Sequence, residues 1–137
     1  MKKQLNLLGL GLLLMSALAY ADTVTLKVNI PFSFVVGKAT MPAGEYSIQG
    51  LGLEGNPISI RKSDKAASSL TLAIRCQSLK TPEQSKLVFH RYGDRYFLAQ
   101  IWTAGNNWGH ELPKSRREAE MALDYQVKKV VLVASLR

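Results

Sequence analysis

Cysteine and histidine are scarce in this chain of 137 residues, which has one cysteine and two histidines. An intramolecular disulfide needs two cysteines, and a zinc site usually needs three or four ligands. The sequence also lacks a Gly-x-Ser-x-Gly nucleophile elbow and a His-Glu-x-x-His pair. We therefore predict a protein without a metal site, without a cofactor and without enzymatic activity.

Long apolar runs are confined to the N-terminus. Two lysines precede an apolar run from Leu5 to Leu18, and Ala19-Tyr20-Ala21 supplies the small residues of a cleavage site. The run is shorter than the roughly 20 residues that span a bilayer, and no cysteine follows it for lipid attachment. We predict that residues 1–21 are a signal peptide and that residues 22–137 form one exported domain, periplasmic or secreted, without a transmembrane segment after cleavage.

Acidic residues are outnumbered by basic ones. Removing the predicted signal peptide, which carries two lysines and no acid, lowers the formal charge from +8 to +6. Such a charge keeps an exported protein soluble and favours anionic neighbours. The expected partners are a glycan, a lipid or another anionic component of the cell envelope, and nucleic acid is not expected.

Alternation of apolar and polar residues predicts β-strands along most of the chain. The clearest case has apolar residues at every even position from Val24 to Val36, and Pro31 predicts a bend that lets this strand belong to two sheets or turn a barrel corner. Seven strands are expected, at residues 24–36, 45–49, 58–62, 70–76, 86–92, 95–102 and 127–134.

Gly93-Asp94 predicts a two-residue hairpin turn, in which paired residue numbers sum to 187. Phe89 then faces Leu98, and His90 faces Phe97. Both faces of this hairpin are apolar enough to be covered, so we expect it to be central. One face should carry Leu87, Phe89, Tyr96, Leu98 and Trp102, and the other Val88, Phe97, Ala99 and Ile101.

A short helix is expected from about residue 116 to Asp124. Ser115 and Glu118 fit a capping box, in which each side chain satisfies a free amide of the first turn. Ala119, Ala122 and Leu123 follow at helical spacing, and the helix should lean on the sheet. Strands and helices do not alternate, so the sequence predicts a mainly β fold: an antiparallel sandwich or small barrel of about seven strands, with one helix before the last strand.

The single cysteine, Cys76, falls in the expected strand 70–76. Leu70, Leu72 and Ile74 share its face by alternation, which favours a buried, inert thiol. The alternative is a reactive cysteine or one that forms an intermolecular disulfide.

A candidate ligand site lies between the hairpin and the helix. Trp108 stands in a polar loop rich in Asn and Gly without an obvious packing partner, and basic residues follow at the helix start. The basic cluster is either a solvated face, a clamp for a carboxylate such as that of Glu111, or a site for an anionic partner. The tentative ligand-binding residues are Trp108, His110, Lys114, Arg116 and Arg117.

Two other functions compete with binding. A hydrolase-like enzyme would use His90 or His110 with Asp94, although His90 fits a packed strand residue and Asp94 a turn residue. A structural or assembly protein of the envelope would instead use an exposed strand edge to pair with a partner.

Three blocks occur in one order and span much of the predicted exported domain: IPFSFVVGKATMPAGEYSI, KLVFHRYGDRYFLAQIWT and ELPKSRRE. Together they resemble a family of small exported bacterial proteins of unknown function. The resemblance implies a secreted, mostly β domain and supplies no activity, cofactor or catalytic residue.

Overall fold

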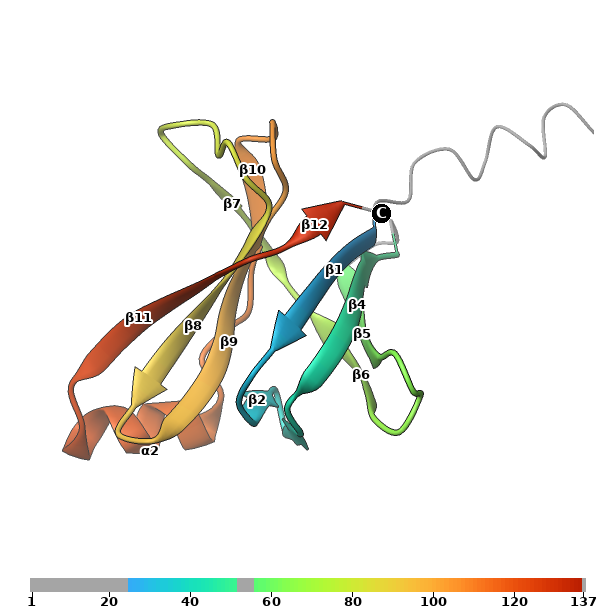
Figure 1. Cartoon of the computed structure of the whole chain (residues 1–137). Helices are drawn as coiled ribbons and strands as arrows, with labels where there is room; N and C mark the ends of the chain where they lie inside the picture. Colours follow the sequence, from blue (N-terminus) through green and yellow to red (C-terminus); the bar gives the residue numbers. More distant parts are fainter. Residues whose placement is uncertain (1–24, 52–55, 137) are drawn as a thin grey trace, which may run out of the picture.

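A computed structural model of the protein describes residues 25–51 and 56–136, which form two packed β-sheets and one helix (Figure 1). The predicted signal peptide, residues 1–21, lies outside the described residues. In spatial order, the first sheet consists of β12 (Ser135–Leu136), β1 (Thr25–Ile30), β4 (Gly44–Gly50), β5 (Pro57–Lys62) and β6 (Ser68–Leu72).

The second sheet is built around the predicted hairpin. Its main path runs through β11 (Val127–Val133), β8 (Lys86–Tyr92), β9 (Arg95–Trp102), β10 (Trp108–Glu111) and β7 (Ile74–Gln77). The small hairpin of β2 (Phe34–Val36) and β3 (Ala39–Met41) joins it through one parallel pair, Val35 with Phe97. β8 and β9 lie inside this sheet, as predicted.

The predicted fold class is confirmed: the protein is mainly β and sandwich-like, it is not a closed barrel, and its helix precedes the last strands. The described residues contain twelve strands instead of about seven. Two predicted strands are interrupted where the chain passes from one sheet to the other, at residues 31–33 and 73, and the last predicted strand is followed by the additional strand β12 in the first sheet. The predicted bend at Pro31 is one of these crossings. The remaining difference comes from β3 and β10, where no strand was predicted.

The core lies between the two sheets. β1 turns its even-numbered residues inward, as the alternation predicted, and β4 does the same with Tyr46 and Ile48. The second sheet contributes the inner face of the hairpin. The largest fully buried apolar side chains include Ile30, Phe34, Met41, Tyr46, Ile58, Ile60, Leu87 and Phe89.

The predicted hairpin register is confirmed from Phe89–Leu98 to Tyr92–Arg95, around a turn in which Gly93 has a φ of +61°. A β-bulge then inserts Ala99, so that Leu87 faces Ile101. Beyond a bulge the side chains of one strand change faces. The face predictions for Ile101 and Trp102 were therefore wrong: Ile101 belongs to the core, and Trp102 lies on the opposite face.

The prediction for the strand containing Cys76 was wrong as well. In β6 it is Ser69 and Thr71 that lie opposite the buried Ile60 and Ile58. Leu70 and Leu72 consequently point outward and are 66% and 63% exposed. The cysteine belongs to β7 of the second sheet and is only partly buried, as a free thiol. Burial raises its pKa, with a further rise from Glu111 and an opposing backbone hydrogen bond from Gly109.

The predicted helix is confirmed as α2 (Arg116–Asp124), with Ser115 as its N-cap. Its packing face differs from the prediction, because Ala119, Ala122 and Leu123 are exposed. The helix instead contacts the sheet through Glu118 and Met121. Among the described residues, no helix has the length and apolar character needed to cross a membrane.

Candidate functional site

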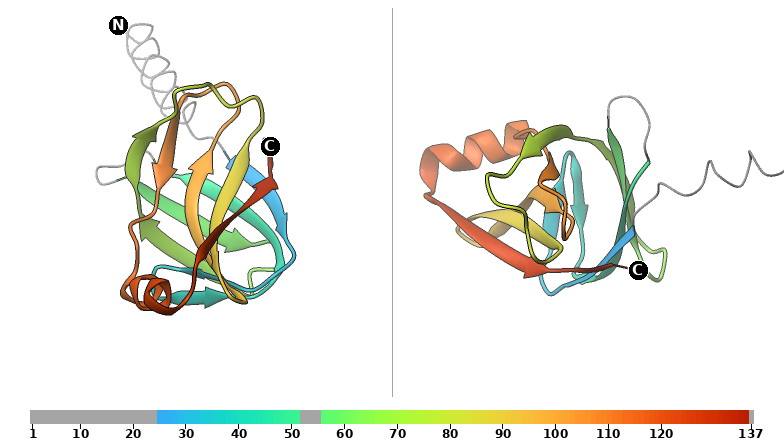
Figure 2. Two further views of the ribbon diagram at one scale, coloured as in Figure 1. Left: turned by 90° about the vertical axis from the view of Figure 1, so that its left-hand side faces the viewer. Right: turned by 90° about the horizontal axis from the view of Figure 1, so that it is seen from above.

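The face of the second sheet that points away from the core is divided into two halves. The half next to the hairpin turn carries His90, Tyr92 and Phe97, and α2 lies over it (Figures 1 and 2). The half further from the turn carries Lys86, Val88, Gln100 and Trp102, and these side chains line a groove. We call these the covered half and the open half.

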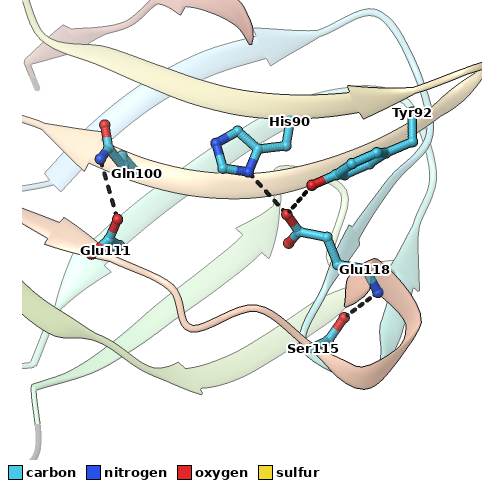
Figure 3. Close-up of polar contacts among 6 residues, drawn as sticks. All are labelled: His90, Tyr92, Gln100, Glu111, Ser115 and Glu118. Atoms are coloured by element: carbon cyan, nitrogen blue, oxygen red, sulfur yellow. Dashed lines mark hydrogen bonds and ion pairs between the residues drawn. The ribbon is translucent and has the colours of Figure 1, made fainter. Parts of the chain in front are cut away.

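A buried carboxylate joins α2 to the covered half (Figure 3). Glu118 is only 4% exposed, and its Oε2 lies 2.9 Å from the hydroxyl of Tyr92 and 2.9 Å from Nδ1 of His90. The backbone amide of Glu118 donates to the Ser115 hydroxyl oxygen over 3.1 Å. Half of the predicted capping box is thus present. The Glu118 side chain, which was expected to return to the helix start, binds the sheet instead.

The contact with Glu118 determines how His90 and Tyr92 are hydrogen-bonded. The Glu118 oxygen can accept a hydrogen bond from the Tyr92 hydroxyl and, in the tautomer that carries a hydrogen on Nδ1, a second one from His90. Burial raises the pKa of Tyr92 to about 12, and the hydrogen bond to Glu118 adds to the rise. The hydroxyl therefore remains a donor throughout the neutral range. A buried carboxyl group is costly unless it is hydrogen-bonded, and Tyr92 and His90 supply the bonds.

Apolar contacts complete the covered half. Met121 packs on the cluster of Val35, Tyr92 and Phe97. Tyr125, just after the helix, lies so close to Gly93 that a Cβ there would come within 3.2 Å of its ring. Gly93 is therefore required both for its positive φ and for this approach.

The open half forms a groove of about 570 Å³. A row of paired residues, Val131–Val88–Gln100, crosses three strands on this face. The segment 78–84 forms one wall and is tied to the neighbouring loop by backbone bonds from Ser78 to Asn107 and from Gly105 to Pro82. The groove is lined by Ser78, Lys80, Thr81, Pro82, Glu83, Gln84, Lys86, Val88, Gln100, Trp102, Lys129 and Val131.

The groove floor is held in one arrangement. The indole of Trp102 donates to the Gln100 side-chain oxygen over 3.1 Å, and the amide nitrogen of Gln100 donates to Glu111 over 3.4 Å. Gly109 lies directly against the Trp102 ring, where an added Cβ would stand only 2.5 Å from a ring carbon. Trp102 is consequently 7% exposed and forms a fixed floor.

Positive charge surrounds this floor. Lys86 comes from β8, Lys129 from β11 and Lys80 from the wall segment, while Glu83 is the one acid among the lining residues. Neither Lys86 nor Lys129 has an ion-pair partner among the described residues. The groove therefore presents an excess of unpaired ammonium groups.

The structure divides the five predicted ligand-binding residues between two places. Trp108 and His110 lie on β10, and Arg75 stands over the Trp108 ring at 4.7 Å from its centroid. Trp108 is thus 41% exposed but does have a packing partner. His110 lines a separate cavity of about 220 Å³ between the sheets, together with apolar residues such as Leu26 and Ile58.

The imidazole ring of His110 has an unused hydrogen-bonding atom. Its Nδ1 is buried and has no hydrogen-bond partner among the residues that the structure describes. Burial lowers its pKa, and the nearby Arg75 lowers it further. Both effects favour a neutral imidazole at pH 7.

The predicted basic cluster lies at the start of α2, at the opposite end of the second sheet from Trp108 (Figure 1). Lys114, Arg116 and Arg117 are all exposed there, and Arg116 pairs with Glu120 over 3.6 Å. The predicted clamp on Glu111 is not observed in the described part of the chain, where Glu111 instead bonds Gln100. Lys114, Arg116 and Arg117 therefore do not share a surface with Trp108 and His110.

The residues proposed for a hydrolase are arranged differently from the prediction. The acid beside His90 is Glu118, whereas Asp94 lies in the hairpin turn and bonds neither histidine in the described structure. His110 lines the cavity between the sheets, away from the face that carries His90. Within residues 25–51 and 56–136, no three His, Cys, Asp or Glu side chains gather as metal ligands.

Sequence reasoning missed Glu118 and the groove. Glu118 had a sufficient local explanation as a capping residue, which hid its contact with His90 and Tyr92. Lys86 and Val88 alternate onto one face of a single predicted strand, but the sequence did not pair this strand with the one that carries Lys129. The position of Trp102 depends on the β-bulge at Ala99, and no residue at that place in the sequence predicts a bulge.

Comparison with protein-family models, curated proteins and solved structures gave no match. The resemblance of the three sequence blocks to small exported bacterial proteins therefore stays a prediction, as do the signal peptide and the export of the domain.

Proposed function

We propose that the protein is a non-enzymatic binding domain of the cell envelope and that the groove of the open half holds an acidic saccharide. The observation that carries this proposal is the groove itself, in which lysines from three separate segments surround a fixed floor. Its volume of about 570 Å³ falls within the usual range of ligand sites, roughly 300–1,000 Å³.

The lining favours a saccharide over a lipid chain. Hydroxyl and amide groups from Ser78, Thr81, Gln84 and Gln100 can bond sugar hydroxyls, and the lysines can bond carboxylates. The apolar part of the lining is limited to Pro82, Val88, Trp102 and Val131. An acyl chain would require a larger apolar surface, because its binding depends on burying many methylene groups.

The covered half supports a structural role for the buried acid. Glu118 uses its Oε2 to hold His90 and Tyr92, and this contact fixes α2 on the sheet. We infer that the acid and histidine position the helix and do not catalyse a reaction.

Charge reversal in the groove tests the proposal. We expect Lys86→Glu or Lys129→Glu to weaken binding of a galacturonic acid oligosaccharide about tenfold, since repulsion replaces one attraction. The matched control is Lys128→Glu, on the same strand but pointing to the other face, which should change the affinity by less than about twofold. Calorimetric titration measures all four proteins, with a neutral galactose oligomer as the control ligand.

Three results would contradict this function. One is equal binding of the neutral and acidic oligomers. Another is an equal loss of affinity in the Lys128 and Lys129 variants, which would indicate a diffuse charge effect. The third is binding to vesicles of anionic phospholipid in the absence of any saccharide binding.

A further inference from the structure

The cavity between the two sheets is separate from the groove of the open half. It measures about 220 Å³, and β1, β4 and β5 line it from the first sheet while β9 and β10 line it from the second. The groove lies on the outer face of the second sheet, and its described lining shares no residue with that of the cavity. A ligand in the cavity would therefore leave the groove free.

The lining of the cavity combines an apolar surface with a few polar groups. Its described residues are the apolar Leu26, Ile48, Pro57, Ile58 and Ile101, the polar Asn56, Thr103, Asn106 and His110, and Gly50. None of them carries a charge at pH 7, because burial lowers the pKa of His110 and keeps its imidazole neutral. A charged ligand would thus lose its water without gaining a counter-charge from these residues.

His110 is the polar group of this lining that most needs a partner. Its Nδ1 is buried and has no hydrogen-bond partner among the described residues. The other ring nitrogen, Nε2, is on the cavity side, since a Cβ on Gly50, which also lines the cavity, would stand 4.0 Å from it. Nε2 is therefore the atom through which the ring can bond a molecule in the cavity.

We propose that the cavity binds a small uncharged molecule with an apolar body and one hydroxyl group, which bonds Nε2 of His110. A hydroxyl both donates and accepts, so it suits either tautomer of the neutral ring. An apolar cavity of about 150 Å³ holds one benzene molecule, and the present volume of about 220 Å³ therefore suits one ring with a short substituent. This site does not depend on saccharide binding in the groove.

Water alone fills such a lining poorly. A buried water makes about three hydrogen bonds and takes up about 30 Å³, so several waters would be needed. Many of them would face the five apolar residues and lack bonds. Their release by an apolar ligand is favourable, and the remaining hydroxyl replaces the bond to His110.

Benzyl alcohol is the probe, with toluene as a ligand without the hydroxyl and benzoate as a charged ligand. Titration followed by NMR measures their affinities for the folded protein, and NOEs locate the bound ring. We expect benzyl alcohol to bind with a Kd of roughly 0.1–1 mM. Its ring should show NOEs to the methyl groups of Ile48, Ile58 and Ile101 and none to Val88 or Val131 of the groove.

Two substitutions test the cavity and the hydrogen bond separately. Gly50→Val adds a side chain inside the cavity, at a strand position without positive φ, and should weaken both benzyl alcohol and toluene about tenfold or more. His110→Phe keeps a ring but removes Nε2, and should weaken benzyl alcohol about three- to tenfold while leaving toluene unchanged. The control is Ser59→Val, which adds similar volume on the outer face of β5 and should change neither affinity.

Circular dichroism verifies the fold of each variant. The proposal is supported if Gly50→Val loses both ligands and His110→Phe loses affinity for benzyl alcohol alone. It is overturned if the wild-type protein shows no saturable binding of benzyl alcohol, which would indicate a water-filled cavity, or if the NOEs place the ring in the groove. Equal losses of benzyl alcohol and toluene in His110→Phe would overturn the hydrogen bond, and benzoate that binds as tightly as benzyl alcohol would overturn the choice of an uncharged ligand.

Discussion

The two halves of the outer sheet face are built from the same strands but differ in what covers them. In the covered half, α2 places a buried carboxylate on His90 and Tyr92 and an apolar side chain on Phe97. In the open half, water reaches lysines around a narrow apolar floor. One hairpin thus supplies a structural contact at one end and a solvent-exposed groove at the other.

The comparison shows how the side chains of the sheet determine how much of its outer face α2 can cover. A nine-residue helix covers only a short length of sheet. Through Glu118, α2 lies over the part of the sheet that carries His90 and Tyr92 as hydrogen-bond partners. Beyond it, Lys86 and Lys129 would each need a partner if they were covered. The open half therefore stays accessible to a ligand that brings negative charge with it.

The largest expected effect is in the covered half. Glu118→Ala leaves the buried Tyr92 hydroxyl and Nδ1 of His90 without their acceptor, and we expect the free energy of unfolding to fall by about 3 kcal/mol. Urea denaturation measures the change. The control is Glu120→Ala, which removes an exposed ion pair and should cost less than about 0.5 kcal/mol. Equal effects of the two substitutions would mean that Glu118 does not hold the helix.

A smaller effect is expected at the floor of the open half. Gly109→Ala places a Cβ 2.5 Å from the Trp102 ring, and relieving this overlap should cost about 2 kcal/mol. The displaced ring should also alter the groove, so saccharide affinity should fall together with stability. The control is Gly105→Ala, where nothing lies within 4 Å of an added Cβ. This variant should lose stability only through the backbone strain of its positive φ of 78°. Normal binding by a folded Gly109→Ala protein would argue against the groove as the ligand site.

Tyr92→Phe separates the tyrosine from the rest of the covered half. At neutral pH the lost hydrogen bond should lower the free energy of unfolding by about 1 kcal/mol. The folded-state pKa of Tyr92 is raised to about 12, so its contribution is present below the unfolded value of about 10 and is lost as the pH rises through 12. Denaturation between pH 9 and about 12 should show a shallower fall for Tyr92→Phe than for Tyr96→Phe. Identical pH profiles would contradict a buried Tyr92 hydroxyl.

The smallest effect is expected for the lysines of the open half. Lys86→Ala and Lys129→Ala should each change the free energy of unfolding by less than about 0.5 kcal/mol, because neither ion-pairs in the described structure and both side chains reach solvent. The same two substitutions should weaken binding of the acidic oligosaccharide. A large loss of stability would show that the open half, like the covered half, is held by its polar residues.

The sequence was sufficient for the features that local chemistry decides. The hairpin register follows from Gly93-Asp94, the inward face of β1 from strict alternation, and the helix start from Ser115. Pro31 indicated a bend because it cannot continue the ladder. In each case one residue type permits few backbone arrangements.

The features that sequence could not supply depend on distant contacts. Leu70 and Leu72 alternate like core residues, yet they face outward because the pairing with β5 sets Ser69 and Thr71 beside the buried Ile60 and Ile58. Glu118 has the same residue type whether it caps a helix or bonds His90, and only the packing of α2 decides between them. Trp108 looked free because its partner, Arg75, lies on a strand remote in sequence.

The pairing of β12 with β1 has a consequence for the order of folding. Ser135 and Leu136 pair with Lys27 and Leu26, and the contact between Ser135 and Lys27 joins residues 108 positions apart. Contacts of such long sequence separation form late and slow the folding of β-proteins. A ribosome releases β1 long before β12, so one edge of β1 stays unpaired until the last strand is made.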